Sequence, residues 1–514
     1  MSRITEKRDV QDQLINYLSG IGWTFIERDE LPAWRANDET QPFLVDVLRS
    51  QLAELNHWQE GDPRIDEVVR RLRLIPASLE GNEQFLAALR GQWNAYDPAR
   101  RREYAVALID YANPKANVYH FSEEIWFQDR DRRRLDNVLY VNGLPVVLVE
   151  NKSPKLQDPG LEGFNDVQDV YTRQIPEFIK YPIPFAVCAT RLEYGATWNP
   201  STKAFYKWKA NGKDYGLENL AKSFFAKEQV LRLLQDYAIF YRMDDALQKF
   251  VLRPHQMRVV EKIEERVVAA QSDDAAADTG LESHTQGSGK TLSMIVAAAK
   301  LRRRHELSNP TLFIVVDRVE LETQMAQNLE AFGLDAIVAQ SKHHLRTLLN
   351  HDARGVIVTT IHKFDGMPKN RTSRRNVVLL VDEAHRSQEG ELGIYMRAAL
   401  PNALRFGFTG TPIDRGKVGR GTYEIFGSPV DPKGVHDEYT INESIEDGTT
   451  LPLWYTLAPT NIWVDKLKLE QEFAGLLEEF WETVDEEGAG SQEALSRLLQ
   501  RADKDHALGA AALE

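Results

Sequence analysis

The stretch LESHTQGSGKT at 281–291 constrains the fold of this chain more than any other. Its second half has the form of a glycine-containing loop that opens a helix. Glycines let backbone N–H groups close around phosphate oxygens, and the N-terminus of the helix adds a favourable dipole. The pattern therefore predicts a phosphate-binding loop ending in Gly287, Ser288, Gly289, Lys290 and Thr291.

Two residues of this loop have predicted contacts with a nucleotide. Lys290 is expected to reach the β- and γ-phosphates, and the Thr291 hydroxyl is expected to hold Mg²⁺. One departure is visible, because His284 stands where the pattern GxxxxGK[ST] has its first glycine. Taken alone, the string also fits an ordinary glycine turn, so its assignment depends on the segments that follow.

Those segments alternate between strand and helix patterns, as in a parallel α/β sheet. Strand patterns lie within 311–317, 355–364, 376–388 and 405–412. The third is a run of five apolar residues that ends in Asp382, Glu383, Ala384 and His385. A carboxylate at the carboxyl end of a buried strand, beside a phosphate loop, is where Mg²⁺ must be held.

These positions give each motif a predicted role. We expect Asp382 to bind the metal through water and Glu383 to orient and polarise the attacking water. His385 is expected to couple the state of the bound nucleotide to the side of the domain that faces DNA. The loop that links the ATP and nucleic-acid sites is expected to be formed by Thr409, Gly410 and Thr411.

Gln256 lies upstream of the phosphate loop, near the start of a helix predicted to run to about residue 270. In helicases a glutamine at this place commonly reads the adenine edge, and an ordinary helix N-cap region is the alternative. The motifs have the order and spacing of the first RecA-like domain of a superfamily 2 helicase or translocase of the DEAH-box type, which the region resembles.

A second candidate site lies within 134–153. VLYV and PVVLVE are strand patterns separated by Asn142-Gly143-Leu144, a hairpin signal. The period of a strand places Glu150 and Lys152 on one face, and Asp136 begins the partner strand. Asp136 and Glu150 are expected to hold Mg²⁺, while Lys152 would orient or help deprotonate a water and offset charge on a phosphate.

This arrangement resembles the PD-(D/E)xK nuclease motif, although an exposed strand end with a salt bridge gives the same bare pattern. The apolar strand, the turn and the following ENKS strengthen the resemblance, while Leu135 replaces the usual proline. The nuclease family has a glutamine and a tyrosine four residues apart on the next helix. The candidates in this chain are Gln168 and Tyr171, which are three residues apart, and Gln174 lies three residues beyond Tyr171. Acidic residues of the first helix are surface candidates that could assist the metal: Glu6, Asp9 and Asp12.

With 514 residues the chain is too long for one core, so several domains are expected. We predict an α/β protein with a nuclease domain and helical extension at 1–245, a first RecA-like motor domain at 246–460 and an acidic helical segment at 461–514. The last segment has 5 Lys or Arg and 13 Asp or Glu residues, so it supplies much of the net charge of −14. The overall charge of the chain therefore does not decide whether its partner is a nucleic acid.

A single cysteine, Cys188, excludes intrachain disulfides and cysteine-rich zinc sites and suits a reducing compartment. No run of 18 apolar residues occurs and the N-terminus has no apolar signal segment, so neither membrane spanning nor secretion is expected. We therefore predict a cytoplasmic protein.

Several strings together resemble the restriction (R) subunit of type I restriction–modification enzymes, over roughly 1–460. They are VDRVELETQ, TTIHKF, DEAHRSQEG, GFTGTPI and YTINESIEDGTTLPLWY, and they follow an N-terminal nuclease pattern. The resemblance implies a prokaryotic enzyme that uses ATP and Mg²⁺. Such a subunit joins methyltransferase (M) and specificity (S) subunits, pumps double-stranded DNA and cuts it when it is unmodified.

A superfamily 2 motor also needs a second RecA-like domain of about 150 residues. Only 54 residues follow position 460, so we expect an N-terminal fragment that binds nucleotide weakly and hydrolyses it poorly. Two alternatives remain open. One is a helicase or repair translocase whose nuclease-like domain does not cut, and the other is a non-catalytic, nucleotide-switched DNA-binding scaffold.

Overall fold

The computed structural model divides the chain into a compact unit, Met1–Leu451, and a second unit, Pro452–Glu514. The predicted acidic helical segment at 461–514 lies outside the described residues, apart from two isolated helical positions at 471 and 475. The described residues are 6–97, 101–210, 212–213, 215–243, 246–272, 277–387, 391–413, 421–452, 471 and 475.

A mixed seven-stranded sheet organises the first half of the described chain, in the order β1-β4-β5-β6-β7-β8-β9. Neighbouring strands are antiparallel except β1 with β4 and β6 with β7, which are parallel. The strands are β1 (Thr24–Ile26), β4 (Tyr119–Gln128), β5 (Arg132–Val141), β6 (Leu144–Asn151), β7 (Pro184–Cys188), β8 (Leu192–Ala196) and β9 (Phe205–Lys207).

The predicted hairpin between β5 and β6 is confirmed. Asn142 and Gly143 both have positive φ, 54° and 80°, as a tight two-residue turn requires. A Cβ atom on Gly143 would lie 2.6 Å from the carbonyl oxygen of Leu44, so only glycine fits there. The turn sets the pairing of Val141 with Leu144, and an irregularity between Leu139 and Tyr140 then shifts the register by one residue before the strands reach Asp136 and Glu150.

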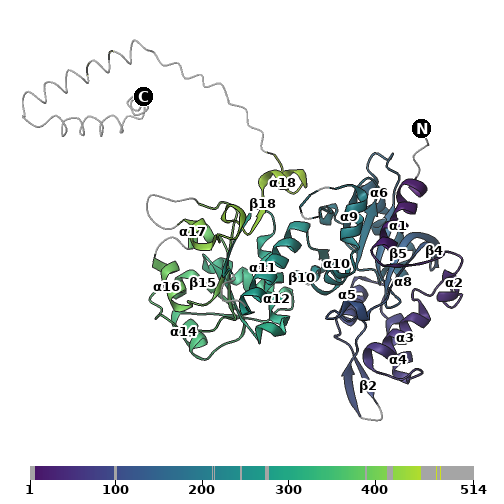
Figure 1. Ribbon diagram of the computed structural model, residues 1–514, viewed down its shortest axis with the longest axis horizontal. Helices are drawn as coiled ribbons and strands as arrows, with labels where there is room; N and C mark the ends of the chain where they lie inside the picture. The colour runs from purple at the N-terminus through teal and green to yellow at the C-terminus, as the bar shows by residue number, and fades with distance from the viewer. Residues whose placement is uncertain are drawn as a thin grey trace, which may run out of the picture. The chain divides into compact units, whose positions relative to one another are not determined.

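Helices from two parts of the chain pack against this sheet (Figure 1). Before β4 come a π-helix η1 (Lys7–Gln11), α1 (Asp12–Gly20), α2 (Leu31–Trp34), α3 (Val45–Asn56), α4 (Pro63–Arg73), α5 (Leu79–Leu89) and the hairpin β2 (Asn94–Asp97) with β3 (Arg102–Ala105). Between β6 and β7 come α6 (Pro159–Asn165), the π-helix η3 (Asp166–Tyr171), α7 (Thr172–Gln174) and α8 (Pro176–Ile179).

The connection to the second half differs in part from the helical extension that was predicted at the end of 1–245. Helices α9 (Leu217–Phe224), α10 (Lys227–Arg232) and η5 (Leu233–Tyr237) form, but an antiparallel hairpin follows, β10 (Ala238–Met243) with β11 (Ala246–Val251). The prediction was wrong over the hairpin because packing favours it there: Tyr241 of β10 stacks on Phe332, with ring centroids 5.5 Å apart.

A parallel seven-stranded sheet organises the second half, in the order β14-β15-β13-β16-β17-β12-β18. Its strands are β12 (Thr279–His284), β13 (Thr311–Val316), β14 (Ala336–Val338), β15 (Gly355–Thr360), β16 (Val377–Val381), β17 (Leu404–Thr409) and β18 (Asp437–Tyr439). The helices are α11 (Pro254–Ser272), α12 (Lys290–Arg303), α13 (Val319–Ala331), α14 (Lys342–Asn350), α15 (Ala384–Ser387), α16 (Glu391–Ala399), α17 (Thr422–Phe426) and α18 (Ile441–Glu446).

Both faces of this sheet are buried, as its continuous apolar strands predict. Alternate residues of β13 enter different cores: Ile314 packs with α11, α12 and α13, whereas Phe313 and Val315 pack with α14, α16 and α17. The predicted α/β class is therefore confirmed. Among the described residues, no helix has the length and apolar character needed to cross a membrane.

Candidate functional site

The hairpin β5–β6 brings together the first group of predicted site residues. Asn137 pairs with Val149 across the two antiparallel strands, so Asp136 and Glu150 are direct cross-strand neighbours on one face. Both are buried, with 9% and 1% of their surface exposed. The sequence prediction that these carboxylates approach each other thus has a geometric basis in the hairpin register.

Each group in this cluster has a defined partner. The Asp136 Oδ2 atom accepts a hydrogen bond of 2.8 Å from the backbone N–H of Asn151. Lys152 Nζ lies 3.2 Å from Glu150 Oε2 and 2.7 Å from Asp166 Oδ2. Asp166, at the start of η3, was not predicted from the sequence, since no local signal connects it to the strand.

The surroundings of the two carboxylates disfavour their charged forms. Burial, together with repulsion from Asp136, raises the pKa of Glu150 to about 8. Burial likewise raises the pKa of Asp136, and Glu6 of the first helix adds to that effect. Burial lowers the pKa of Lys152, but the charges of Glu150 and Asp166 outweigh it, so the net shift is upward.

A cation would fit between these carboxylates. Glu150 Oε1 is buried and has no hydrogen-bond partner among the described residues, so one carboxylate oxygen is available as a ligand. A divalent ion would also offset the burial that raises both pKa values and the repulsion from Asp136 that raises the pKa of Glu150. Among the described residues no group of three or more His, Cys, Asp or Glu side chains gathers as a metal site.

Tyr171 and Gln168, the two candidates on the helix after β6, have different surroundings. Tyr171 ends η3 near the site: burial, followed by the charges of Glu150 and Asp136, raises the pKa of its hydroxyl. Gln168 is buried, and its Nε2 atom donates to the carbonyl of Ala196 at 2.8 Å, on β8.

The acidic candidates of the first helix are less closely connected to the site. Asp12 is exposed, and Glu6 is near enough to influence Asp136. The side chain of Asp9 lies outside the described part of the structure. Help from this helix in holding a metal therefore stays a prediction.

The second group of predicted residues surrounds the phosphate loop, residues 285–289, which joins β12 to α12. Gly287 and Gly289 have positive φ, 78° and 82°, which glycine adopts without strain. Lys290 begins α12, and its Nζ atom lies 3.4 Å from the carbonyl oxygen of His284. Thr291 follows in the first turn of the same helix, so both residues lie beside the helix N-terminus.

Gln256 contacts this loop directly. Its Nε2 atom donates to the carbonyl oxygens of Ser288 and Gly289, both at 3.3 Å, and its Oε1 atom accepts from the backbone N–H of Arg253 at 2.9 Å. The side chain is buried, so in this structure it braces the loop. Its predicted contact with a base remains a prediction.

Asp382 follows β16, and its backbone N–H donates to the carbonyl of Val315 at 2.8 Å, which continues the pairing with β13. Burial, followed by repulsion from Glu383, raises the pKa of Asp382, and Lys290 opposes that effect. Glu383 has a φ of 45°, a conformation that costs a non-glycine residue energy. The carboxylates and the lysine of the loop therefore lie within electrostatic reach of one another.

His385 connects this segment to the end of β17. Its Nδ1 atom lies 2.9 Å from the Thr409 hydroxyl and 3.4 Å from the Glu383 carboxylate. The Thr409 hydroxyl also accepts from the backbone N–H of Thr411 at 3.1 Å. Gly410 lies against the phosphate loop, since a Cβ atom there would approach the carbonyl oxygen of His284 to 3.1 Å. The structure therefore brings the predicted nucleotide and coupling residues together.

Three residues at this site were not predicted from the sequence. His255, Asp437 and Tyr439 hold the phosphate loop from α11 and β18, with contacts given below. No sequence signal marks Asp437, and Tyr439 was named only as the first residue of the string YTINESIEDGTTLPLWY, with no role, because the pairing of β18 with β12 joins segments about 150 residues apart. His255 is the neighbour of Gln256, so only its place beside a named motif could have drawn attention to it.

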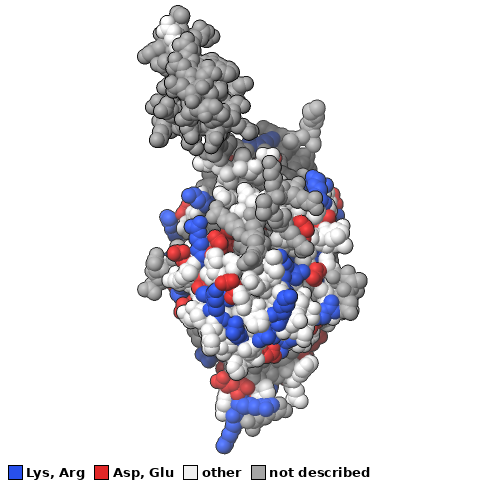
Figure 2. All heavy atoms as spheres, turned by 90° about the vertical axis from the view of Figure 1, so that its left-hand side faces the viewer, with Lys and Arg blue, Asp and Glu red and all other residues white. Residues whose placement is uncertain are grey.

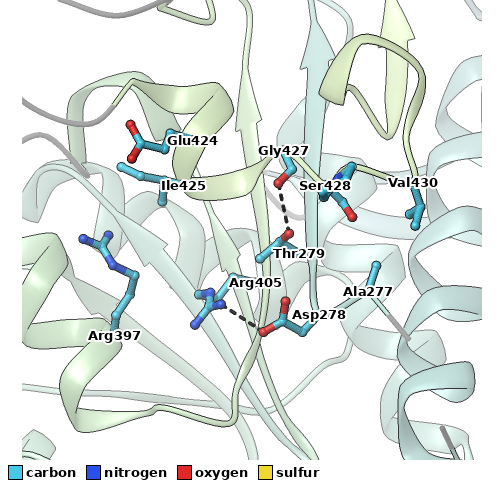
Figure 3. Close-up of a pocket in the computed structure, with 11 residues that line it drawn as sticks. Ala277, Asp278, Thr279, Arg397, Arg405, Glu424, Ile425, Gly427, Ser428 and Val430 are labelled. Atoms are coloured by element: carbon cyan, nitrogen blue, oxygen red, sulfur yellow. Dashed lines mark hydrogen bonds and ion pairs between the residues drawn. The ribbon is translucent and has the colours of Figure 1, made fainter. Parts of the chain in front are cut away.

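A pocket of about 510 Å³ lies at the opposite end of β12 from the phosphate loop (Figure 3). Thr279, the first residue of β12, donates to the carbonyl of Gly427, and Arg405 pairs with Asp278 at 3.0 Å. On the face shown in Figure 2, Lys and Arg side chains are interspersed with Asp and Glu, so no continuous patch of one sign appears among the described residues. Neither feature adds residues to the two sites above.

Comparisons with known proteins match each half of the chain to a family. Residues 3–203 match the family described as the type I restriction enzyme R protein N terminus, and residues 255–486 match the SWI2/SNF2 ATPase family. The type I restriction enzyme HindI endonuclease subunit of Haemophilus influenzae is 28% identical over 544 residues, covering 96% of this chain and 50% of that protein.

A second relative is the type I restriction enzyme SauCOLORF180P endonuclease subunit of Staphylococcus aureus, which is 27% identical and covers 86% of this chain and 46% of that protein. The chain thus spans about half the length of these curated relatives. Among solved structures, the Pyrococcus furiosus Hef helicase domain matches 50% of this chain and 54% of its own, with 17% identity and a TM-score of 0.32.

Proposed function

We propose that the chain forms the nuclease and ATP-driven motor part of a type I restriction endonuclease subunit, because residues 3–203 match the R protein N terminus family and residues 255–486 match the SWI2/SNF2 ATPase family. The activity is cleavage of unmodified double-stranded DNA, coupled to translocation on it. The observation that supports this most directly is the presence of two separate sites in one chain: buried carboxylates with Lys152 on a β-hairpin, and a phosphate loop beside Asp382 on a parallel sheet. The proposed domains are 1–245, 246–460 and 461–514.

At the nuclease site, Asp136 and Glu150 are the proposed ligands of Mg²⁺, which supplies Lewis-acid polarisation of the phosphodiester and activation of water. Lys152 is held between Glu150 and Asp166, which keeps its ammonium group protonated beside the carboxylates. It can therefore offset charge on the scissile phosphate and orient the attacking water. Tyr171 lies at the same place and is a candidate for contact with the DNA backbone.

At the motor site, the proposed cofactor is ATP with Mg²⁺. Backbone N–H groups of the phosphate loop and Lys290 bind the phosphates, while Thr291 and Asp382 are the proposed holders of the metal. Glu383 orients the attacking water, and its strained backbone fixes where the carboxylate stands. His385 and Thr409 then pass the state of the nucleotide to the loop of Gly410 and Thr411.

The relatives are named as endonuclease subunits of type I restriction enzymes, so we propose that methyltransferase and specificity subunits are the protein partners and the cytoplasm is the location. One observation favours a second candidate function, a translocase whose nuclease-like domain does not cut. The third carboxylate near Asp136 and Glu150, that of Asp166, is paired with Lys152, and no group of three or more His, Cys, Asp or Glu side chains gathers as a metal site among the described residues.

The test is cleavage of an unmodified plasmid by an R subunit containing this chain, assembled with its M and S partners in the presence of ATP and Mg²⁺. We expect Asp136→Asn to abolish cutting and to leave DNA-stimulated ATP hydrolysis unchanged, and Lys290→Ala to abolish both. Asp46→Asn, which changes an exposed carboxylate on α3 outside both proposed sites, is the matched control for Asp136 and should cut normally. Cutting that survives Asp136→Asn would assign the protein to the second candidate function.

A further inference from the structure

Strand β18 lies beside β12, whose last residue leads into the phosphate loop. The parallel register pairs Glu282 with Asp437 and His284 with Tyr439. The pairing continues past the strand, because the backbone N–H of Thr285 donates to the carbonyl of Tyr439 at 3.0 Å. The first residue of the loop is therefore fixed by β18.

Asp437 is the centre of a buried charged cluster at this point. Its carboxylate is 2.8 Å from His284 Nε2, 2.7 Å from Arg258 Nε and 2.8 Å from Lys262 Nζ. Burial raises the pKa of Asp437, but hydrogen bonds from His284 and Arg258 outweigh that effect and hold it below its usual range. The carboxylate is thus ionised and accepts from three donors on two elements, α11 and β12.

The other end of the phosphate loop is held through the same strand. His255 Nε2 lies 2.8 Å from the carbonyl oxygen of Ser288, and the ring stacks on Tyr439 with a centroid distance of 3.7 Å. Burial and the nearby His284 lower the pKa of His255 to about 3, so the ring is neutral at pH 7 and Nε2 carries the hydrogen that it donates. Consequently β18 fixes the loop at Thr285 directly and at Ser288 through His255.

This arrangement gives His284 a structural role at the position where the pattern GxxxxGK[ST] has its first glycine. Its side chain is fully buried and joins the end of β12 to Asp437, while its carbonyl oxygen is the group that faces Lys290. A displaced His284 would move that carbonyl and the N–H groups that follow it. Phosphate binding by backbone N–H groups depends on their being arranged before the ligand arrives.

We propose that Asp437 is a positioning residue for nucleotide binding, which holds the phosphate loop in its binding geometry through His284 and the pairing of β18. The inference rests on the proposed nucleotide site and goes beyond it, since neither Asp437 nor His284 touches the nucleotide in it. Asp437 acts on the loop backbone, so its loss weakens nucleotide binding without removing any group that contacts a phosphate.

A matched control lies at the far end of the same elements. Arg266 of α11 pairs with Asp431, 2.7 Å from Nη1 to Oδ2, and also donates to the carbonyl of Thr279 at the start of β12. Both partners are largely buried, with 12% and 6% of their side chains exposed. This ion pair ties α11 to the sheet as Asp437 does, but it lies at the end of β12 away from the phosphate loop.

The first experiment is calorimetric titration of the 514-residue chain with MgADP, comparing Asp437→Asn with Asp431→Asn. In Asp437→Asn an amide N–H group faces the donors of His284, Arg258 and Lys262, and we expect affinity to fall roughly tenfold to a hundredfold. Asp431→Asn should bind within about twofold of wild type, although it loses a comparable ion pair. Equal affinities in the two variants would overturn the proposal.

The second experiment measures hydrogen exchange in the absence of nucleotide, with peptides covering 284–292 and 277–283. We expect Asp437→Asn to speed exchange in the first peptide, and Asp431→Asn to speed it only in the second. Should Asp437→Asn fail to fold, His284→Leu and His284→Gln replace it, because glutamine can still donate to Asp437 and leucine cannot. Faster loop exchange in His284→Leu with rescue in His284→Gln supports the proposal, and equal exchange overturns it.

Lys290→Ala separates this inference from the function on which it rests. If wild type and Lys290→Ala bind MgADP equally, or neither binds, the nucleotide site itself is misassigned. The exchange measurement without nucleotide then still decides whether Asp437 holds the loop. If wild type binds and Lys290→Ala does not, the affinities of the Asp437 and Asp431 variants decide the proposal alone.

Discussion

Metal binding at the nuclease site should depend steeply on pH, because Glu150 must lose a proton before it can act as a ligand. Its pKa is raised from 4.5 to about 8 by burial and by repulsion from Asp136. With that pKa, about 1% of the side chains are ionised at pH 6 and about half at pH 8. Apparent affinity for a divalent cation should therefore rise about 50-fold between these pH values.

The assay is calorimetric titration with Ca²⁺, without nucleotide, at half-unit steps between pH 6 and pH 8. Titrations in two buffers of different ionisation enthalpy also give the protons released, about one per ion at pH 6.5 and about half at pH 8. Glu150→Gln is the control, since an amide of the same shape cannot release a proton. Binding by wild type that changes less than about threefold over this range would refute the argument, because Glu150 would then be ionised without the metal.

The same shift has a consequence for stability. Between pH 4.5 and about 8 the folded chain holds a proton on Glu150 that the unfolded chain has released, so its contribution to stability is present below this window and is lost as the pH rises through it. The slope reaches about 1.4 kcal/mol per pH unit at most. Denaturant titrations without metal should show a smaller loss of stability with rising pH in Glu150→Gln.

Two further predictions concern side chains fixed by the structure. Gly289→Ala should lower the free energy of unfolding by roughly 2–4 kcal/mol, because φ at this position is 82° and the new Cβ atom would lie 2.3 Å from Gln256 Nε2. Gly287→Ala is its control: the new Cβ atom meets no other atom within contact distance, so the loss should be about 1 kcal/mol. Lys249→Met should cost roughly 3–5 kcal/mol, because three buried acceptors lose the Lys249 amino group as donor, whereas Lys222→Met, at a half-exposed side chain, should change stability by less than about 0.5 kcal/mol. Denaturant unfolding without nucleotide measures both pairs, and equal losses within a pair would contradict the reasoning.

Local signals explain why much of the fold could be predicted from the sequence. The turn Asn142-Gly143 specifies a hairpin by its backbone preferences alone, whereas a register shift between Leu139 and Tyr140, which no local signal predicts, sets Asp136 opposite Glu150. Similarly, each apolar strand of the parallel sheet ends in polar residues, and parallel strands place those ends at one edge. Asp382 and Lys290 therefore come together for a reason that is visible in the sequence.

The residues that were missed depend on contacts that no local pattern encodes. The segment 238–251 forms a hairpin because Tyr241 stacks on Phe332 and buried Lys249 donates to the side chains of Asn82 and Thr197. Helix propensity alone misjudges such a segment, since tertiary packing overrides it. Asp437 was missed for a related reason: a parallel strand pairs with a partner far away in the sequence, and the strand itself is only three residues long.

Glu150 and Asp437 show why burial alone does not identify a ligand site. Both are acidic, almost fully buried and placed on strands beside a functional loop or strand end, yet their pKa values shift in opposite directions. Asp437 already has Arg258, Lys262 and His284 as partners, so its charge is satisfied by the protein and its role is to hold other groups in place. Glu150 has a neighbouring carboxylate and only one lysine, so its charge is satisfied only when a further cation binds. The direction of the shift, read together with the partners that cause it, therefore separates a carboxylate that positions a loop from one that is available to a metal.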